Sequence, residues 1–227
     1  MISKGSGNLL RFSTKLHFRE HTRRMFNPEL ARLYTELVSL ATLRDRFAKG
    51  GTADLSLFPP GLVAKQDKPG YQFVEREFNF SCQLWEKGFR AMPQPQTEFG
   101  ISFTPEATFM MEEVGYGLTL EEVVMAWQDG LLNEFLLRSI LDVHASVFQE
   151  FWELGAVHAD PHLKNFIVGM DRQQNWQVWI IDFGMSFWEG FDDRAMPTTV
   201  GSIEQDRDKH LFYLSQFGIE KWVESSL

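Results

Sequence analysis

The sequence predicts an α+β protein of two lobes, a small lobe of strands with one key helix followed by a reduced, mostly helical lobe. Short apolar runs bounded by Gly and Pro surround one helical pattern before residue 113. A Gly-containing hinge over 114–117 then leads into a long helical pattern. Since no internal repeat or low-complexity tract divides the 227 residues further, we expect a single domain.

The distribution of charge along the chain predicts a boundary near residue 26. Residues 1–26 carry six basic groups and one acid, whereas the whole chain has a net charge of −9, so the remainder is strongly acidic. The predicted parts are a basic N-terminal arm over 1–26, an N-lobe over 27–113 and a C-lobe over 114–227. The acidic body argues against general nucleic-acid binding, and no nucleic-acid partner is expected.

The basic arm admits two interpretations. If residues 1–26 are helical, Leu9, Phe12 and Leu16 share one face. That face would make weak contact with an anionic membrane surface, or it would pack on the N-lobe and brace its small sheet. The brace is favoured because a sheet of a few short strands needs additional cover.

Local signals predict the elements of the N-lobe. Pro28 follows the cap candidate Asn27 and begins a helical pattern of leucines. A later helical pattern ends at Gly88, which suits a helix C-terminus. The predicted elements are a helix from Pro28, strands over 55–58 and 62–64, a helix over 72–87 and a strand over 108–112.

The C-lobe begins with a long helix. Apolar residues recur at helical spacing over 131–154, and Gly155 ends the pattern. Two short strands are predicted next, over 166–168 and 178–181, with a polar turn over 171–175 between them.

The loop before these strands carries the most informative residues. His158 stands two residues before Asp160, and Asn165 follows Asp160 by five. The second strand ends in Asp182-Phe183-Gly184. This arrangement resembles the catalytic loop and the Asp-Phe-Gly motif of the protein-kinase superfamily. The resemblance implies a two-lobed protein-kinase-like fold.

The resemblance also implies roles for these residues. Asp160 would be the catalytic base that accepts the proton of a hydroxyl acceptor. Asn165 and Asp182 would hold Mg²⁺, which prefers such oxygen ligands. His158 would be structural, and Gly184 would allow a sharp turn after the metal ligand.

Other details resemble small atypical branches of that superfamily. The run 159–162 is similar to UbiB-type kinases, and Asp160-Pro161-His162 with 165–168 is similar to lipopolysaccharide core heptose kinases. Residues 204–211 resemble the closing helix of heptose kinases and RIO-type kinases. Ala159 replaces the usual Arg, so activation by a phosphorylated loop bound to that Arg is not expected.

A lysine and a glutamate are expected to hold the phosphates of ATP. Val63-Ala64-Lys65 resembles the strand that carries the phosphate-binding lysine. Glu77 on the next helix is the preferred partner of Lys65, with Glu75 and Glu86 as alternatives.

The remaining nucleotide contacts are expected around the hinge and a Gly-rich loop. The resemblance implies that Met111 is the gatekeeper residue. It also implies that backbone groups from Glu112 to Val114 form hydrogen bonds with adenine. The loop over the phosphates would contain Gly50 and Gly51, with residues 5–7 as the other candidate.

The sequence therefore predicts a kinase that uses ATP and Mg²⁺ to phosphorylate a hydroxyl-bearing acceptor, either a sugar, lipid or other small molecule or a protein Ser/Thr. A pseudokinase scaffold that only binds nucleotide is the alternative. A metal hydrolase built on His158, Asp160 and His162 is a weaker one, because zinc sites need further ligands.

We expect a cytoplasmic protein, peripheral at a membrane if the arm binds lipid. The single cysteine, Cys82, allows no intrachain disulfide, and no signal peptide or apolar run of about 20 residues is evident.

Overall fold

The computed structural model describes residues 53–58, 61–102, 106–114, 118–170, 176–191 and 200–224. Its mixture of helices and small antiparallel sheets confirms the predicted α+β class. Several predictions fall outside these residues: the basic arm, the helix from Pro28, the loop with Gly50 and Gly51, residues 5–7 and the hinge glycines of 115–117.

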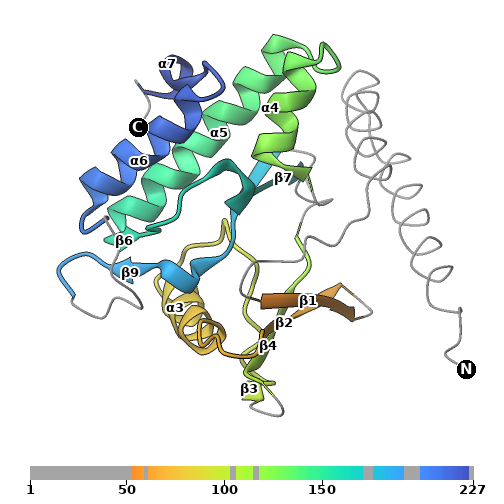
Figure 1. The fold of residues 1–227 in the computed structure, drawn as a ribbon, viewed down its shortest axis with the longest axis vertical. Coiled ribbons are helices and arrows are strands. Elements are labelled where there is room, and N and C mark those ends of the chain that lie inside the picture. The colour runs from red at the N-terminus through yellow and green to blue at the C-terminus, as the bar shows by residue number, and fades with distance from the viewer. Residues whose placement is uncertain are drawn as a thin grey trace, which may run out of the picture. The chain divides into compact units, whose positions relative to one another are not determined.

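The described residues of the N-terminal part form a four-stranded antiparallel sheet beside one helix (Figure 1). The strand order is β1 (Ala53–Phe58), β2 (Leu62–Asp67), β4 (Thr108–Glu112) and β3 (Ile101–Ser102). Helix α3 (Val74–Glu86) buries Val74 against Ala53 and Phe109, and the Phe78 ring lies 5.5 Å from that of Phe109. The three strands and the helix predicted in this part are all present, within three residues at each end.

Strand β2 fixes the start of α3 through Asp67. The Asp67 carboxylate accepts hydrogen bonds from the N–H groups of Phe73, at 3.1 Å, and Val74, at 3.2 Å. It therefore caps a helix whose own N-cap residue provides no side-chain cap. Because side chains alternate along a strand, Lys65 points to the same face of β2 as Asp67. The helix that carries Glu77 is thus attached to the strand that carries Lys65.

Among its described residues, the C-terminal part contains four α-helices and two small sheets. Figure 1 shows α4, α5 and α6 on the side of β7 away from the four-stranded sheet. The helices are α4 (Leu120–Gln128), α5 (Glu134–Glu153), α6 (Ile203–Ser215) and α7 (Glu220–Val223). The strands are β5 (Leu118–Thr119), β7 (Phe166–Met170) and β8 (Trp176–Ile180) in one sheet, and β6 (Ala156–Val157) with β9 (Phe187–Trp188) in the other.

The long helix was predicted within three residues, but α4 was missed. Thr119 and Glu122 form a capping box at its start, with the Glu122 N–H donating to Thr119 Oγ1 at 3.2 Å and the Thr119 N–H to Glu122 Oε2 at 3.0 Å. The Thr-x-x-Glu pattern before an apolar run is a sequence signal for a helix start. It would have separated α4 from the hinge.

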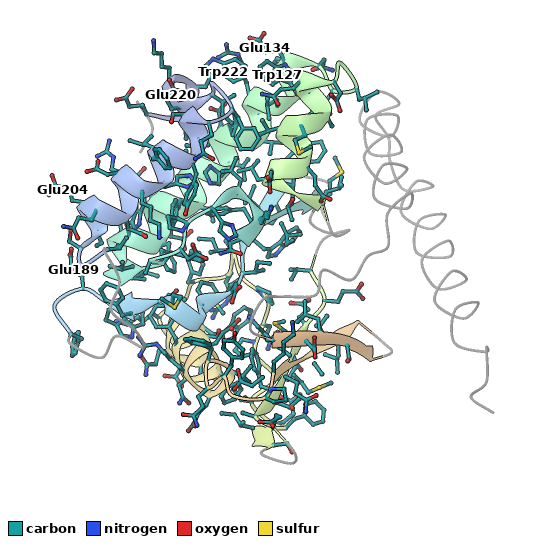
Figure 2. All side chains as sticks on the ribbon, viewed as in Figure 1. Trp127, Glu134, Glu189, Glu204, Glu220 and Trp222 are labelled. Atoms are coloured by element: carbon teal, nitrogen blue, oxygen red, sulfur yellow. The ribbon has the colours of Figure 1, made fainter. Side chains whose placement is uncertain are left out.

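Aromatic contacts tie the helices together. Figure 2 shows Trp127 of α4 beside Trp222 of α7, with ring centroids 5.2 Å apart. The Arg138 guanidinium of α5 lies 4.0 Å from the Trp222 ring, a cation–π contact. Among the described helices, none has the length and apolar composition to cross a bilayer.

Two histidines are buried where α5 packs against α6. The rings of His144 and His210 are 4.8 Å apart, and neither residue is exposed. Burial lowers the pKa of His144 well below its ordinary value. Burial also lowers the pKa of His210 to about 4, although a hydrogen bond to the Pro161 carbonyl acts in the opposite direction. Both imidazoles are therefore neutral in the folded protein near pH 7.

These histidines predict acid-sensitive stability. Below their ordinary pKa of about 6.5, the unfolded chain binds protons that the folded chain does not, so stability falls as the pH decreases towards 4. Each histidine costs up to about 1.4 kcal/mol per pH unit in this window. Urea unfolding from pH 8 to pH 4.5 should show a shallower decline for His144→Leu than for the wild type. Parallel curves for the two proteins would contradict the assignment.

Candidate active site

The loop around Asp160 is held by both ring nitrogens of His158. His158 Nε2 lies 3.0 Å from the Ile181 carbonyl, and the Asp160 N–H donates to Nδ1 at 3.3 Å. These contacts place the proton on Nε2 and a lone pair on Nδ1. His158 is fully buried and joins the loop to the end of β8. Because both nitrogens are engaged, this histidine does not suit the zinc ligand of the hydrolase interpretation.

Asn165 and Asp182 are brought together through Ile181. The Ile181 N–H donates to the Asn165 carbonyl at 2.9 Å. Asp182, the residue after Ile181, is therefore held close to Asn165. The Asn165 side-chain nitrogen donates to the Asp160 carbonyl at 2.9 Å and approaches Asp160 Oδ2 at 3.5 Å. Its amide oxygen, rather than its nitrogen, is thus the group suited to a cation.

Lys65 connects three elements. Its ammonium donates to Glu77 Oε2 of α3 at 2.6 Å and to Asp182 Oδ1 at 2.8 Å. The side chains of Lys65 and Glu77 are 9% and 4% exposed, so the first pair is almost completely removed from water. Glu75 and Glu86, the alternatives raised from the sequence, are exposed on α3. The structure therefore places Glu77 against Lys65.

The electrostatics of this cluster follow from burial and proximity. Burial alone would lower the pKa of Lys65, but the charges of Glu77 and Asp182 outweigh it and raise that pKa. Burial raises the pKa of Glu77 to about 7, although Lys65 acts in the opposite direction. Partial desolvation opposes ionisation of Asp182, yet the charge and hydrogen bond of Lys65 lower its pKa. The ammonium of Lys65 is thus the fixed charge of the cluster.

The turn after β8 differs from the sequence expectation. Asp182, rather than Gly184, takes a left-handed backbone with φ +65°, which costs of order 1–3 kcal/mol at a non-glycine residue. Gly184 lies in close packing, where an added Cβ would meet Phe73 Cβ at a tight 3.3 Å. The glycine therefore lets the start of α3 approach the segment after Asp182.

A second chain of contacts joins α3 to the catalytic loop. Arg76 Nη2 donates to the Ser186 carbonyl at 2.7 Å, and Ser186 Oγ donates to the His158 carbonyl at 3.2 Å. The Phe183 ring lies 5.8 Å from both Phe80 of α3 and His158. A displacement of α3 would therefore disturb the loop as well as Lys65.

Asp206 of α6 supports the loop around Asp160, a contact that sequence reasoning missed. Its carboxylate accepts the N–H groups of His158, at 3.0 Å, and Ala159, at 2.8 Å, and the Trp152 indole N–H at 3.0 Å. Burial raises its pKa. The bond to Ala159 supports a second left-handed residue, with φ +65°. No local pattern marks Asp206, because its partners lie 47 to 54 residues away.

The expected hinge residues follow the sheet. Met111 lies on β4 opposite Val63 and is partly buried. The N–H groups of Glu112 and Glu113 donate to the carbonyls of Gln94, at 2.9 Å, and Gly61, at 2.7 Å. Three N–H groups are proposed to contact adenine. Among the described residues, the Val114 N–H, unlike the other two, donates to no backbone carbonyl.

Comparisons with known proteins agree with this geometry. Residues 68–196 match the model of the lipopolysaccharide kinase (Kdo/WaaP) family. The match covers more than half of the chain, which therefore belongs to this family. No curated protein matches the chain.

Solved structures show the same fold. The crystal structure of the BubR1 kinase domain aligns with a TM-score of 0.50 and 16% identity, over 65% of this chain. The alignment covers 48% of the BubR1 chain, so this protein spans about half of its length. Together the two matches confirm the predicted membership of the protein-kinase-like superfamily and its two-lobed fold.

The buried cluster predicts a pH-dependent cost of removing Lys65. Lys65→Met leaves Glu77 without its cation and should lower the free energy of unfolding by about 3 kcal/mol at pH 8. The loss should be smaller at pH 6, where Glu77 takes up a proton. Urea unfolding of Lys65→Met and of Lys65→Met/Glu77→Leu, which should regain most of the loss, checks this. Lys68→Met, a partly exposed control, should cost less than about 1 kcal/mol. Equal losses for the two lysines would contradict the prediction.

Proposed function

We propose that this member of the lipopolysaccharide kinase family transfers the γ-phosphate of ATP, with Mg²⁺, to a hydroxyl of a saccharide acceptor. One observation carries the proposal: the Lys65 ammonium binds Glu77 of α3 and Asp182 of the segment after β8 at the same time. Phosphoryl transfer depends mainly on positioning and on charge stabilisation. A buried cation held between two elements provides both.

The donor groups on the chain suit ATP. Lys65 would bind its α- and β-phosphates, with Glu77 keeping the ammonium in place. The Val114 N–H is the favoured hinge donor to adenine, because Glu112 and Glu113 use theirs within the protein. Met111, partly buried on β4, would border the adenine. The loop with Gly50 and Gly51 is proposed to cover the phosphates.

The site also suits Mg²⁺. Asn165 offers an amide oxygen and Asp182 a carboxylate that is 47% exposed, and such oxygens are ligands that magnesium prefers. Asn165 and Asp182 would hold the ion. When bound, Mg²⁺ would neutralise charge on the phosphates. Asp182 would serve both the ion and Lys65, so its position after Ile181 matters for both.

Asp160 would act as the base. Its side chain is 36% exposed, which leaves the carboxylate accessible to an acceptor hydroxyl. As the acceptor oxygen forms its bond to the γ-phosphorus, the carboxylate takes the hydroxyl proton and the bond to the ADP oxygen breaks. Asn165 holds the loop carbonyl of Asp160 during this step.

A saccharide acceptor is favoured by the family match. A polar cleft of about 730 Å³ runs along α3 to Ser186, but Lys65, Asp160 and Asp182 do not line it, so it carries no argument about the acceptor.

The first prediction concerns metal-dependent nucleotide binding. ATP with Mg²⁺ at about 100 times its Kd should stabilise the fold by about 2.7 kcal/mol. Asp182→Ala should lose the magnesium-dependent part, because it removes a proposed ligand. Thermal unfolding with ATP alone and with ATP and Mg²⁺ measures this. Asp142→Ala, an exposed carboxylate on α5, is the control and should behave as the wild type. An unchanged magnesium effect in Asp182→Ala would count against the site.

The second prediction separates chemistry from binding. Asp160→Ala should keep its ATP affinity and lose roughly 10²- to 10⁴-fold in the rate of phosphoryl transfer, the usual contribution of a general base. Asn165→Ala should lose both rate and magnesium affinity. Mass spectrometry of core oligosaccharides incubated with ATP and each variant measures the transfer. An Asp160→Ala rate equal to that of the wild type would remove Asp160 from its role. Binding without transfer by the wild type would favour a pseudokinase scaffold.

A further inference from the structure

One face of α6 contacts successive residues of the catalytic loop. Asp206, Lys209, His210 and Tyr213 are spaced three and four residues apart, which places them on the same side of the helix. Asp206 binds the N–H groups of His158 and Ala159. His210 Nδ1 lies 2.7 Å from the Pro161 carbonyl, and burial together with the charge of Asp160 raises the pKa of Tyr213. Helix α6 therefore fixes the backbone on both sides of Asp160.

Lys209 is the cation of this face. Its ammonium donates to the Ala159 carbonyl at 2.8 Å and lies 3.9 Å from Asp160 Oδ1. On the other side of the carboxylate, His162 Nε2 lies 3.4 Å from Asp160 Oδ2. The two carboxylate oxygens thus each face a nitrogen, one from α6 and one from the loop itself.

The contact between Lys209 and Asp160 adds little to the stability of the fold. The side chains of Lys209 and Asp160 are 28% and 36% exposed, and ion pairs with this access to water contribute little to stability. The bond to the Ala159 carbonyl, however, fixes the ammonium next to the carboxylate before any acceptor arrives. A preset charge beside a base is useful when the position of that base limits the reaction.

We propose that Lys209 is a positioning residue for Asp160, which orients the carboxylate towards the acceptor hydroxyl through its contacts with Ala159 and Asp160. The inference rests on the proposed function, because Asp160 acts as a base only if the protein transfers phosphate. It adds a role for α6 in the chemistry, beyond support of the loop.

A double-mutant cycle in the full chain tests the proposal. The rate of phosphate release or transfer from ATP is measured for the wild type, Lys209→Met, Asp160→Asn and the double variant, with the KM for ATP. Lys209→Met should lose about 10- to 100-fold in kcat with the KM for ATP unchanged. The double variant should be no slower than Asp160→Asn, because Lys209 acts through that carboxylate.

Two further variants separate positioning from folding. Lys209→Arg keeps the charge and a donor for the Ala159 carbonyl and should recover most of the rate. Lys221→Met removes an exposed lysine of α7 and should match the wild type. The proposal would be overturned if Lys209→Met kept the kcat of the wild type, or if the losses of Lys209→Met and Asp160→Asn added up in the double variant. Neither result would contradict the proposed function. A wild type that turns over no ATP, with water or any acceptor, would instead defeat the proposed function and this inference with it.

Discussion

The site depends on one buried interaction, the Lys65 ammonium between the carboxylates of Glu77 and Asp182. Removing two such charges from water is costly, and close contact with good geometry is required to compensate. That requirement fixes the distance between β2, α3 and the segment after β8. Asp67 reinforces it by holding the start of α3 to the same strand. The proposed phosphate-binding charge and the proposed metal ligand are therefore positioned together.

The catalytic loop is held by a different set of contacts, largely to backbone atoms. His158 and Asn165 connect the loop to Ile181, and Asp206 connects it to α6. The bond from the Ala159 N–H to Asp206 supports the left-handed backbone at Ala159, and Asp182 is a second left-handed residue. Strained residues of this kind persist only where neighbouring groups determine their conformation. The strain is concentrated beside Asp160 and at the proposed magnesium ligand.

Local signals explain what the sequence could predict. Helix α3, strand β4 and the long helix α5 follow from apolar periodicity and Gly stops, and the motif residues follow from their spacing. Glu77 was preferred as the partner of Lys65 from the sequence, and the structure confirms this pairing, whereas excluding Glu75 and Glu86 required the register of α3 on the sheet. Residues 204–211 were identified as a closing helix, but the contacts of Asp206 and Lys209 could not be predicted, because they involve atoms about 50 residues away. The sharp turn after the metal ligand was expected at Gly184, whereas the left-handed residue is Asp182.

The most direct test of the account is phosphorus NMR of the pure protein with ATP, Mg²⁺ and a saccharide that carries free hydroxyls. The account predicts that the γ-phosphate signal decreases while a phosphomonoester signal appears, split by the protons of the carbon that bears the new phosphate. The same sample with Asp160→Asn should keep its ATP signal. A spectrum in which ATP binds but no phosphomonoester forms with any acceptor would contradict the claim that the cluster around Lys65 and Asp160 transfers phosphate.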